Sequence, residues 1–206
     1  MVVGRQTYMI ATSTVLFEGR ELIQLHHLID TSAYNDLLQD VASYSKELRE
    51  EKERDALTGL YNKGKFLELK AWLFAGQDAI AVFNFDVNNL KEMNDNHGHE
   101  AGDKLLKKAA DSLHAVEESD IMAFRVGGDE FMLVGLHLDR EAAEALKCRW
   151  EEALERLNAQ DDDVNCVMAC GMVCGKSGYD LDELLAEADE RMYQDKVAKK
   201  NGALPR

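Results

Sequence analysis

The sequence predicts an α+β fold whose core is a split βαβ, or ferredoxin-like, unit with helices around a sheet that contains antiparallel strands. Apolar runs with strand-like or helix-like spacing follow one another in the order β-α-β-β-α-β after residue 75. A Gly-Gly-Asp-Glu tetrad at residues 127–130 separates two of these runs, as expected for the tip of a hairpin. The 206 residues are enough for one such domain and an appendage.

The first part of the chain predicts a β-hairpin followed by a long helix. Strand-like runs at 8–17 and 21–29 flank Glu18-Gly19-Arg20, a turn signal. A helix is expected over 34–53, and its apolar residues are spaced by three and four positions, as in a heptad seam: Tyr34, Leu37, Val41, Tyr44 and Leu48. This seam favours a parallel dimeric coiled coil. The alternative is a single amphipathic helix packed on a globular body.

The elements of the core follow from apolar periodicity. A helix is expected over 63–75, a buried strand over 79–87 and a helix over 101–116, whose apolar residues share one face. The hairpin comes next, with strands at 121–126 and 131–136. A helix over 140–158, a strand over 164–173 and a helix over 181–199 complete the pattern.

The topology brings acidic residues together at one edge of the sheet. In a split βαβ unit the first and third strands are antiparallel neighbours, so the end of 79–87 should lie beside the start of 131–136. Asp86 is at that end, and Asp129 and Glu130 are at that start. Carboxylates that meet without interleaved bases repel one another unless a cation lies between them. This edge is therefore a candidate site for a divalent metal and its phosphates, and the alternative for the tetrad alone is a solvated turn.

Groups suited to phosphates follow the strand that carries Asp86. The turn at Asn89 and Leu90 offers backbone N–H groups, and Lys91 adds a cation. Lys196 and Lys200 lie one helical turn apart on the last helix. They could serve the same site, but the sequence alone favours a position facing solvent.

Asn94 and Asp103 together could read a guanine base. A carboxylate accepts hydrogen bonds from N1–H and the exocyclic amine of guanine, and adenine does not offer this pair of donors. In the alternative interpretation Asp103 interacts with the dipole of its helix and Asn94 caps a turn. His97 and His99 lie between them, but no third soft ligand is near enough in the sequence to predict zinc.

Composition restricts the partners and the compartment. A net charge of −15 disfavours nucleic-acid polymers and anionic membranes, but Mg²⁺ can screen the phosphates of a nucleotide. No apolar run approaches the ~20 residues of a membrane span, and the first residues lack the apolar stretch of a signal peptide. We therefore expect a cytoplasmic chain that carries no membrane segment.

The four cysteines do not predict disulfides. Cys166, Cys170 and Cys174 recur at every fourth position and would share one face of a strand, where a free thiol acts as a small hydrophobe. Burial is also the expected role of Cys148. The alternative, a soft-metal site, lacks the usual Cys-x-x-Cys pair.

Four motifs of the chain resemble those of the GGDEF-domain diguanylate cyclases. Residues 55–62 (DALTGLYN) resemble the opening D-x-L-T-G-L-x-N, and residues 86–103 resemble D-x-x-x-x-K-x-x-N-D…G-H-x-x-G-D. Residues 125–131 (RVGGDEF) match the signature, and 188–196 resemble A-D-x-x-[LM]-Y-x-x-K. The resemblance covers roughly 54–201 and implies a nucleotide-cyclase, or palm-type, domain at 55–206. The preceding parts resemble a partial PAS-like hairpin at 1–33 and a signalling helix at 34–54.

The resemblance implies that a dimer condenses two GTP molecules into cyclic di-GMP, with release of pyrophosphate and with Mg²⁺ or Mn²⁺ as cofactor. Asp86, Asp129 and Glu130 would be catalytic and would hold the metal together with the Val87 carbonyl. Asn94 and Asp103 would read guanine. The remaining GTP contacts would come from Asn89, Leu90, Lys91, Gly128, Lys196 and Lys200. A catalytically inactive GTP-binding regulatory module is the alternative; such members usually lose signature acids, which this chain retains.

The chain departs from the family pattern in three respects. Asn88 stands where the family often has Asp, and Cys170 stands where Ser is common. Many members also carry an R-x-x-D product-binding motif shortly before the signature. Glu118 and Ile121 occupy its two defining positions here, so we expect no product binding through that motif.

Overall fold

The computed structural model describes residues 8–17, 20–160 and 164–200, and the chain divides into two compact units, Met1–Lys52 and Glu53–Arg206. In the first unit, β1 (Tyr8–Phe17) and β2 (Arg20–Asp30) form an antiparallel hairpin that is followed by α1 (Ser32–Glu53). The two predicted strands and the helix are confirmed. Of the predicted turn, residues 18 and 19 lie outside the described residues and Arg20 begins β2.

Helix α1 carries the expected apolar stripe. Its five members are each 57–66% exposed: Tyr34, Leu37, Val41, Tyr44 and Leu48. Apolar side chains repeated at heptad spacing and left exposed in their own unit form a surface that a second helix can cover.

The second unit contains one five-stranded mixed sheet with the order β3-β5-β6-β4-β7. The strands are β3 (Tyr61–Asn62), β4 (Ala79–Val87), β5 (Ile121–Arg125), β6 (Glu130–Leu136) and β7 (Met168–Lys176). β4 pairs antiparallel with both β6 and β7, and β5 pairs antiparallel with β6. This is the predicted split βαβ arrangement, to which β3 adds a short parallel edge beside β5.

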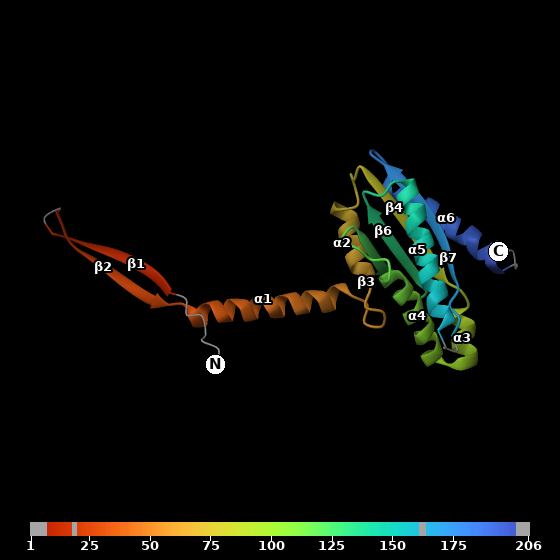
Figure 1. Ribbon diagram of the computed structural model, residues 1–206, viewed down its shortest axis with the longest axis horizontal. Helices are drawn as coiled ribbons and strands as arrows, with labels where there is room; N and C mark the ends of the chain where they lie inside the picture. Colours follow the sequence, from red (N-terminus) through yellow and green to blue (C-terminus); the bar gives the residue numbers. More distant parts are fainter. Residues whose placement is uncertain (1–7, 18–19, 161–163, 201–206) are drawn as a thin grey trace. The chain divides into compact units, whose positions relative to one another are not determined.

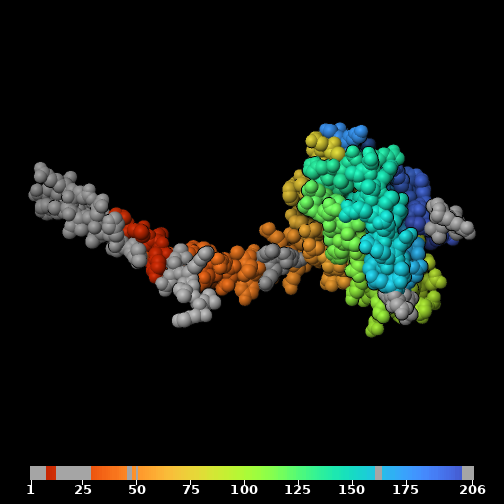
Figure 2. All heavy atoms as spheres, in the orientation of Figure 1, coloured from red at the N-terminus to blue at the C-terminus, as the bar shows by residue number. Residues whose placement is uncertain are grey.

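Helices cover both faces of the sheet (Figure 1). Alternate residues of a strand point to opposite faces, so Phe83 and Phe85 of β4 pack toward α4 (His99–His114) and α5 (Arg140–Ala159). Ile80 and Val82 of the same strand pack toward α2 (Lys63–Trp72) and α6 (Leu181–Lys200). Figure 2 shows α4 in green and α5 in turquoise side by side on the outside of this unit.

Two predicted element boundaries are wrong for local reasons. The helix expected to reach residue 75 ends at Trp72, because the chain turns inward to bury Phe74, which is 1% exposed. The strand expected over 164–173 spans Met168–Lys176 instead. Before it, the Asn158 side chain bonds both the N–H of Cys166, at 2.8 Å, and its carbonyl oxygen, at 2.7 Å. These backbone groups are therefore taken by a side chain instead of a neighbouring strand.

One helix is absent from the sequence prediction. Residues 90–116 contain two helices, α3 (Leu90–His97) and α4, where the sequence predicts one helix starting at 101. Gly98 separates them with a φ of +82°, a conformation that favours glycine. α3 has no fully buried residue, and only Leu90 and Met93 are apolar and pack partly buried against the core, which is too few to reveal the helix by its apolar periodicity.

All four cysteines are free, as expected. Cys166 and Cys170 are buried and Cys174 packs against the same core, but Cys148 is exposed, so the burial expected for it is wrong. Burial raises the pKa of the Cys166 and Cys170 thiols to about 12. A thiol that stays protonated at neutral pH is a poor metal ligand and nucleophile, which argues against the soft-metal alternative.

Candidate active site

Pairing of β4 with β6 places the acidic residues of two distant segments side by side. Asp86 and Glu130 are direct partners in the antiparallel register. The N–H of Val87 donates to the carbonyl oxygen of Asp129 at 2.9 Å, which extends the pairing to the turn. The predicted neighbourhood of the end of β4 and the start of β6 is confirmed.

The Gly-Gly-Asp-Glu turn closes tightly on the start of β6. The N–H groups of Val126 and Gly127 both donate to the carbonyl oxygen of Glu130, at 3.0 and 3.2 Å. A side chain at Gly127 would overlap the Glu130 carboxylate, whereas Gly128 has open space around it. A larger residue at position 127 would therefore displace the Glu130 carboxylate from its present place. Neither of these two glycines is among the residues with positive φ in the described chain.

Lys196 of α6 reaches into this edge of the sheet. Its ammonium nitrogen lies 2.6 Å from Oδ1 and 2.7 Å from Oδ2 of Asp86, which is only 6% exposed. The interpretation that Lys196 faces solvent is therefore wrong. A nearly buried carboxylate needs a positive partner, and Lys196 supplies it.

The expected convergence of three carboxylate side chains is not found. Glu130 is exposed and Asp86 is paired with Lys196. Within 8–17, 20–160 and 164–200, no group of three or more His, Cys, Asp or Glu side chains is arranged to hold a metal ion. The backbone pairing of β4 with β6 therefore does not by itself create a metal site whose ligands all come from the protein.

The donor set nevertheless fits Mg²⁺. This ion is usually held by one or two carboxylates together with water and substrate phosphates, and it needs no complete protein cage. Asp86 and Glu130 offer carboxylate oxygens from directly paired positions, and Val87 offers a peptide carbonyl beside them. Hard oxygen donors of this kind suit Mg²⁺ and Mn²⁺.

A cleft of about 520 Å³ opens at the end of β4, where Val87 and Asp129, the neighbours of Asp86 and Glu130, line it. Several predicted phosphate-binding residues line it, together with polar residues of α3. The described lining residues are Val87, Asn89, Leu90, Lys91, Glu92, Asp95, Asn96, Asp129, Lys196 and Lys200. The lining carries three lysines, which suit phosphates, and three acids, Glu92, Asp95 and Asp129, which suit a cation that accompanies the phosphates.

The N-terminus of α3 points its backbone into the same cleft. Asn89 caps the helix with a φ of +62° and makes no side-chain capping bond, so the first N–H groups of α3 are available to a ligand. Asn tolerates this left-handed conformation better than most residues. The predicted turn at Asn89 and Leu90 is in this way the start of a helix, which adds a favourable dipole for phosphate.

The two predicted base-reading residues lie on facing helices. The Asn94 side chain lies against Gly102, where a Cβ atom would overlap it, and Asp103 is the next residue. Neither Asn94 nor Asp103 is among the described residues that line the 520 Å³ cleft. The structure brings them together at the α3–α4 pair, and their role in reading a base stays a prediction.

Glu92, Asp95 and Asn96 line the cleft but were not predicted as site residues. They occupy positions i, i+3 and i+4 of α3, a spacing that places side chains on one helix face. A prediction of a helix over residues 90–97 would have placed these three side chains on one face and so grouped them as site candidates.

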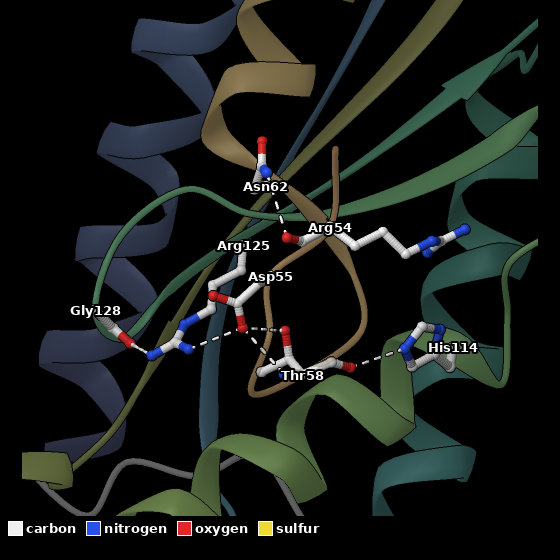
Figure 3. A network of polar contacts seen from close by, with 7 residues as sticks. All are labelled: Arg54, Asp55, Thr58, Asn62, His114, Arg125 and Gly128. Atoms are coloured by element: carbon white, nitrogen blue, oxygen red, sulfur yellow. Dashed lines mark hydrogen bonds and ion pairs between the residues drawn. The ribbon is translucent and has the colours of Figure 1, made fainter. Parts of the chain in front are cut away.

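A polar network joins the opening motif to the signature turn (Figure 3). Asp55 accepts hydrogen bonds from the backbone and the hydroxyl of Thr58 at 3.0 and 2.7 Å, and from the Arg125 guanidinium at 3.0 Å. Arg125 also donates to the Gly128 carbonyl at 2.8 Å. Burial alone would raise the pKa of Asp55, but the bonds from Thr58 and Arg125 outweigh it and hold that pKa below its usual value.

A second cavity occupies the place of the family's product-binding motif. Glu118 forms an ion pair with Arg149 at 2.7 Å and a backbone bridge with Ile121. The described residues lining this cavity include one base, Arg54, and two acids, Glu117 and Glu118. Such a lining does not favour phosphate.

None of the helices in the described part of the chain is long and apolar enough to cross a membrane.

Comparison with known proteins supports the motif assignment. The model of the family "Diguanylate cyclase, GGDEF domain" matches residues 52–202. Diguanylate cyclase VdcA of Vibrio cholerae is 29% identical over 157 residues, which cover 73% of this chain and 46% of VdcA. Cyclic di-GMP phosphodiesterase NbdA of Pseudomonas aeruginosa is 32% identical over 185 residues, which cover 85% of this chain and 23% of NbdA. The chain thus spans less than half the length of either relative.

A solved structure supports the fold. The coiled coil and GGDEF domain of DgcB from Caulobacter crescentus, solved in complex with c-di-GMP, superposes with a TM-score of 0.64 at 21% identity. The match covers 83% of this chain and 92% of that chain. The family model spans well over half of the chain, and its motifs coincide with the cleft, the paired acids and the signature turn described above. The chain therefore belongs to the GGDEF family of diguanylate cyclase domains.

Proposed function

We propose that the chain is a diguanylate cyclase that condenses two GTP molecules into cyclic di-GMP and releases pyrophosphate. The observation that supports this most strongly is that Asp86 and Glu130 pair across β4 and β6 at the edge of a cleft with three lysines. Phosphates and a divalent cation need these two kinds of group together. Because GTP is available in the cytoplasm, the proposal includes the cytoplasmic location expected from the sequence.

In this proposal the triphosphate lies along the N-terminus of α3, where backbone N–H groups and Lys91 bind its oxygens. Lys196 and Lys200 approach from α6, and Lys196 exchanges its contact with Asp86 for a phosphate oxygen. Asp86, Glu130 and the Val87 carbonyl hold Mg²⁺, while Asp129 lines the cleft beside them. When bound there, Mg²⁺ would polarise the α-phosphate and lower the pKa of the attacking hydroxyl.

Each step forms a bond between the 3′-oxygen of one GTP and the α-phosphorus of the other, and it breaks the bond to the β-phosphate oxygen. The hydroxyl proton is released and pyrophosphate leaves with the bond electrons. Two such steps close the ring. Asn94 and Asp103 would hold guanine and so orient the α-phosphate for in-line attack.

Because one domain offers this apparatus for a single GTP, the reaction needs two domains face to face. The exposed apolar stripe of α1 supports a homodimer in which the two helices pair along their heptad seams. Such pairing would raise the effective concentration of one site relative to the other. The hairpin of β1 and β2, which resembles the last hairpin of a PAS sensor fold, would then precede the signalling helix.

The alternative function is a GTP-binding regulatory module without catalysis. Two observations favour it: the described acidic side chains form no cluster of three for a metal, and NbdA, a relative, is named a phosphodiesterase. Incubating the purified chain with Mg²⁺ and GTP at several protein concentrations separates the two functions. A cyclase produces pyrophosphate and cyclic di-GMP with a rate that rises steeply with concentration, whereas a regulatory module binds GTP and leaves it intact.

Replacing Glu130 with Gln tests the metal ligands. The change keeps the size of the side chain but removes a charge that Mg²⁺ needs, so turnover should fall by orders of magnitude while the melting temperature stays nearly unchanged. Glu141→Gln, which changes another exposed glutamate, in the first turn of α5, is the control and should retain full turnover. Near-normal turnover in Glu130→Gln would mean that Glu130 holds no metal.

Asp103→Asn tests base reading. The amide presents a donor where guanine N1–H needs an acceptor, so GTP affinity measured by isothermal titration should weaken by roughly 1–3 kcal/mol. Inosine triphosphate, which lacks the exocyclic amine, provides the comparison. The wild-type chain should bind it less tightly than GTP, and the variant should lose this preference. Unchanged GTP binding would leave Asp103 as a charge at a helix end.

Replacing Val41 and Leu48 with Lys tests the dimer. Like charges at paired seam positions should abolish dimerisation in sedimentation experiments, and specific activity should then depend more steeply on protein concentration. Gln39→Lys with Ala42→Lys adds the same charge to α1 away from the seam, and this control should remain dimeric. If the seam variant sediments as a dimer, the interface lies elsewhere.

Feedback by the product should be weak. The Glu118 carboxylate, already paired with Arg149, would repel the phosphates of cyclic di-GMP, and Ile121 is only 5% exposed and offers no polar group. Initial rates at saturating GTP should therefore stay constant as micromolar product is added. Strong inhibition that GTP does not relieve would show that other residues form a product site.

A further inference from the structure

His114, the last residue of α4, lies between two hydrogen-bond acceptors. Its Nδ1 atom is 2.7 Å from a carboxylate oxygen of Glu117, and its Nε2 atom is 3.1 Å from the carbonyl oxygen of Thr58. Figure 3 shows the ring of His114 turned toward the Thr58 carbonyl. The side chain is 34% exposed, so the contacts are partly shielded from water.

These two contacts require a protonated ring. Carboxylate and carbonyl oxygens accept hydrogen bonds but cannot donate them, and a neutral imidazole has only one N–H. A neutral His114 could therefore bond Glu117 or Thr58, while its other nitrogen would place a lone pair against an oxygen. The imidazolium donates to both.

The charges around the ring favour this form. The hydrogen bond with Glu117 is the largest cause that raises the pKa of His114, and it outweighs the effect of burial. The Thr58 carbonyl and the negative charges of Glu117 and Asp111 act in the same direction. Two positive charges contact the facing turn: Arg54 donates to the Gly59 carbonyl at 2.7 Å, and Arg125 donates to the Asp55 carboxylate at 3.0 Å.

His114 contacts the turn formed by residues 55–60, which is closed by backbone hydrogen bonds between residues of the turn. The N–H of Asp55 donates to the Leu60 carbonyl, and the N–H of Gly59 donates to the Asp55 carbonyl, both at 2.8 Å. Gly59 has a φ of +73°, and Leu60 is fully buried. The contact of His114 with Thr58 therefore fastens this turn, residues 55–60, to the end of α4.

The same turn is connected to the signature turn. Thr58 bonds Asp55, Asp55 pairs with Arg125, and Arg125 donates to the carbonyl of Gly128, the residue before Asp129 (Figure 3). Every link is 3.0 Å or shorter. A shift of Thr58 would thus be passed to the backbone that carries the two signature acids.

We propose that protonated His114 is a positioning residue, which holds residues 55–60 so that Asp55 and Arg125 keep the signature turn in its catalytic geometry. Loss of its proton frees Thr58, and turnover falls as the pH rises. The direction follows from linkage: the stabilisation is fully present below the ordinary histidine pKa of about 6.5 and disappears as the pH rises through the raised pKa of the folded state. The expected change in turnover rests on the proposed cyclase function, but the expected protonation of the His114 ring does not.

The protonation of His114 can be measured without catalysis. In the full chain labelled at histidine, His114→Gln identifies the ring signal in NMR spectra, and the signal should titrate with a pKa above that of an ordinary histidine. Glu117→Gln keeps an acceptor for the Ala123 N–H but removes the charge, so the pKa should fall. A wild-type His114 that titrates at or below the ordinary value would overturn the proposal.

The pH profile of turnover tests the positioning role. At pH 6–7 His114→Gln should lower kcat roughly threefold to tenfold, the range expected for one lost hydrogen bond, with little change in KM. Its kcat should lack the alkaline decline of the wild-type chain, so the two should converge at high pH. His137→Asn, an exposed histidine with a φ of +57° that Asn tolerates, is the control and should keep the wild-type profile. A His114→Gln profile identical to that of the control would contradict the proposal.

Discussion

The antiparallel pairing of β4 with β6 is the constraint on which the site depends. It sets Asp86 opposite Glu130 and, through the Val87–Asp129 hydrogen bond, draws the signature turn to the end of β4. A register shift of one residue would send every side chain of a strand to the other face, so the buried phenylalanines of β4 that pack under α4 and α5 also fix the place of Asp86. The same packing that stabilises the core therefore aligns the acids.

Charge compensation gives the site its second constraint. The chain carries a net charge of −15, yet the cleft beside Asp86 gathers three lysines and the N-terminus of α3. Lys196 neutralises the nearly buried Asp86, which would otherwise lie uncompensated in a low-dielectric region. An incoming triphosphate offers Lys196 another anionic partner, and a cation offers one to Asp86. The ion pair between Lys196 and Asp86 can thus separate when substrate and metal bind, because each side chain gains a new partner of opposite charge.

Sequence patterns were sufficient where a local rule decides the outcome. Apolar periodicity predicted the split βαβ order, and the strand ends named Asp86, Asp129 and Glu130 as neighbours. The same reasoning failed for α3, since only two of its eight residues, Leu90 and Met93, are apolar, which is too few for a periodic signal. It also failed for the start of β7, because the Asn158 side chain, which is remote from any strand pattern, takes the backbone bonds of Cys166.

The sequence by itself determined the fold class, the family motifs and the residue types of the site, since these depend on spacing along the chain. Only the tertiary structure decided which side chains meet. Lys196 turns inward because α6 packs its backbone closely on Gly171 of β7, where any side chain would overlap it. His114 finds Glu117 nearby in the chain but Thr58 far from it, through the packing of α4 against the first turn of the domain. Such contacts depend on distances between elements, which a sequence pattern does not contain.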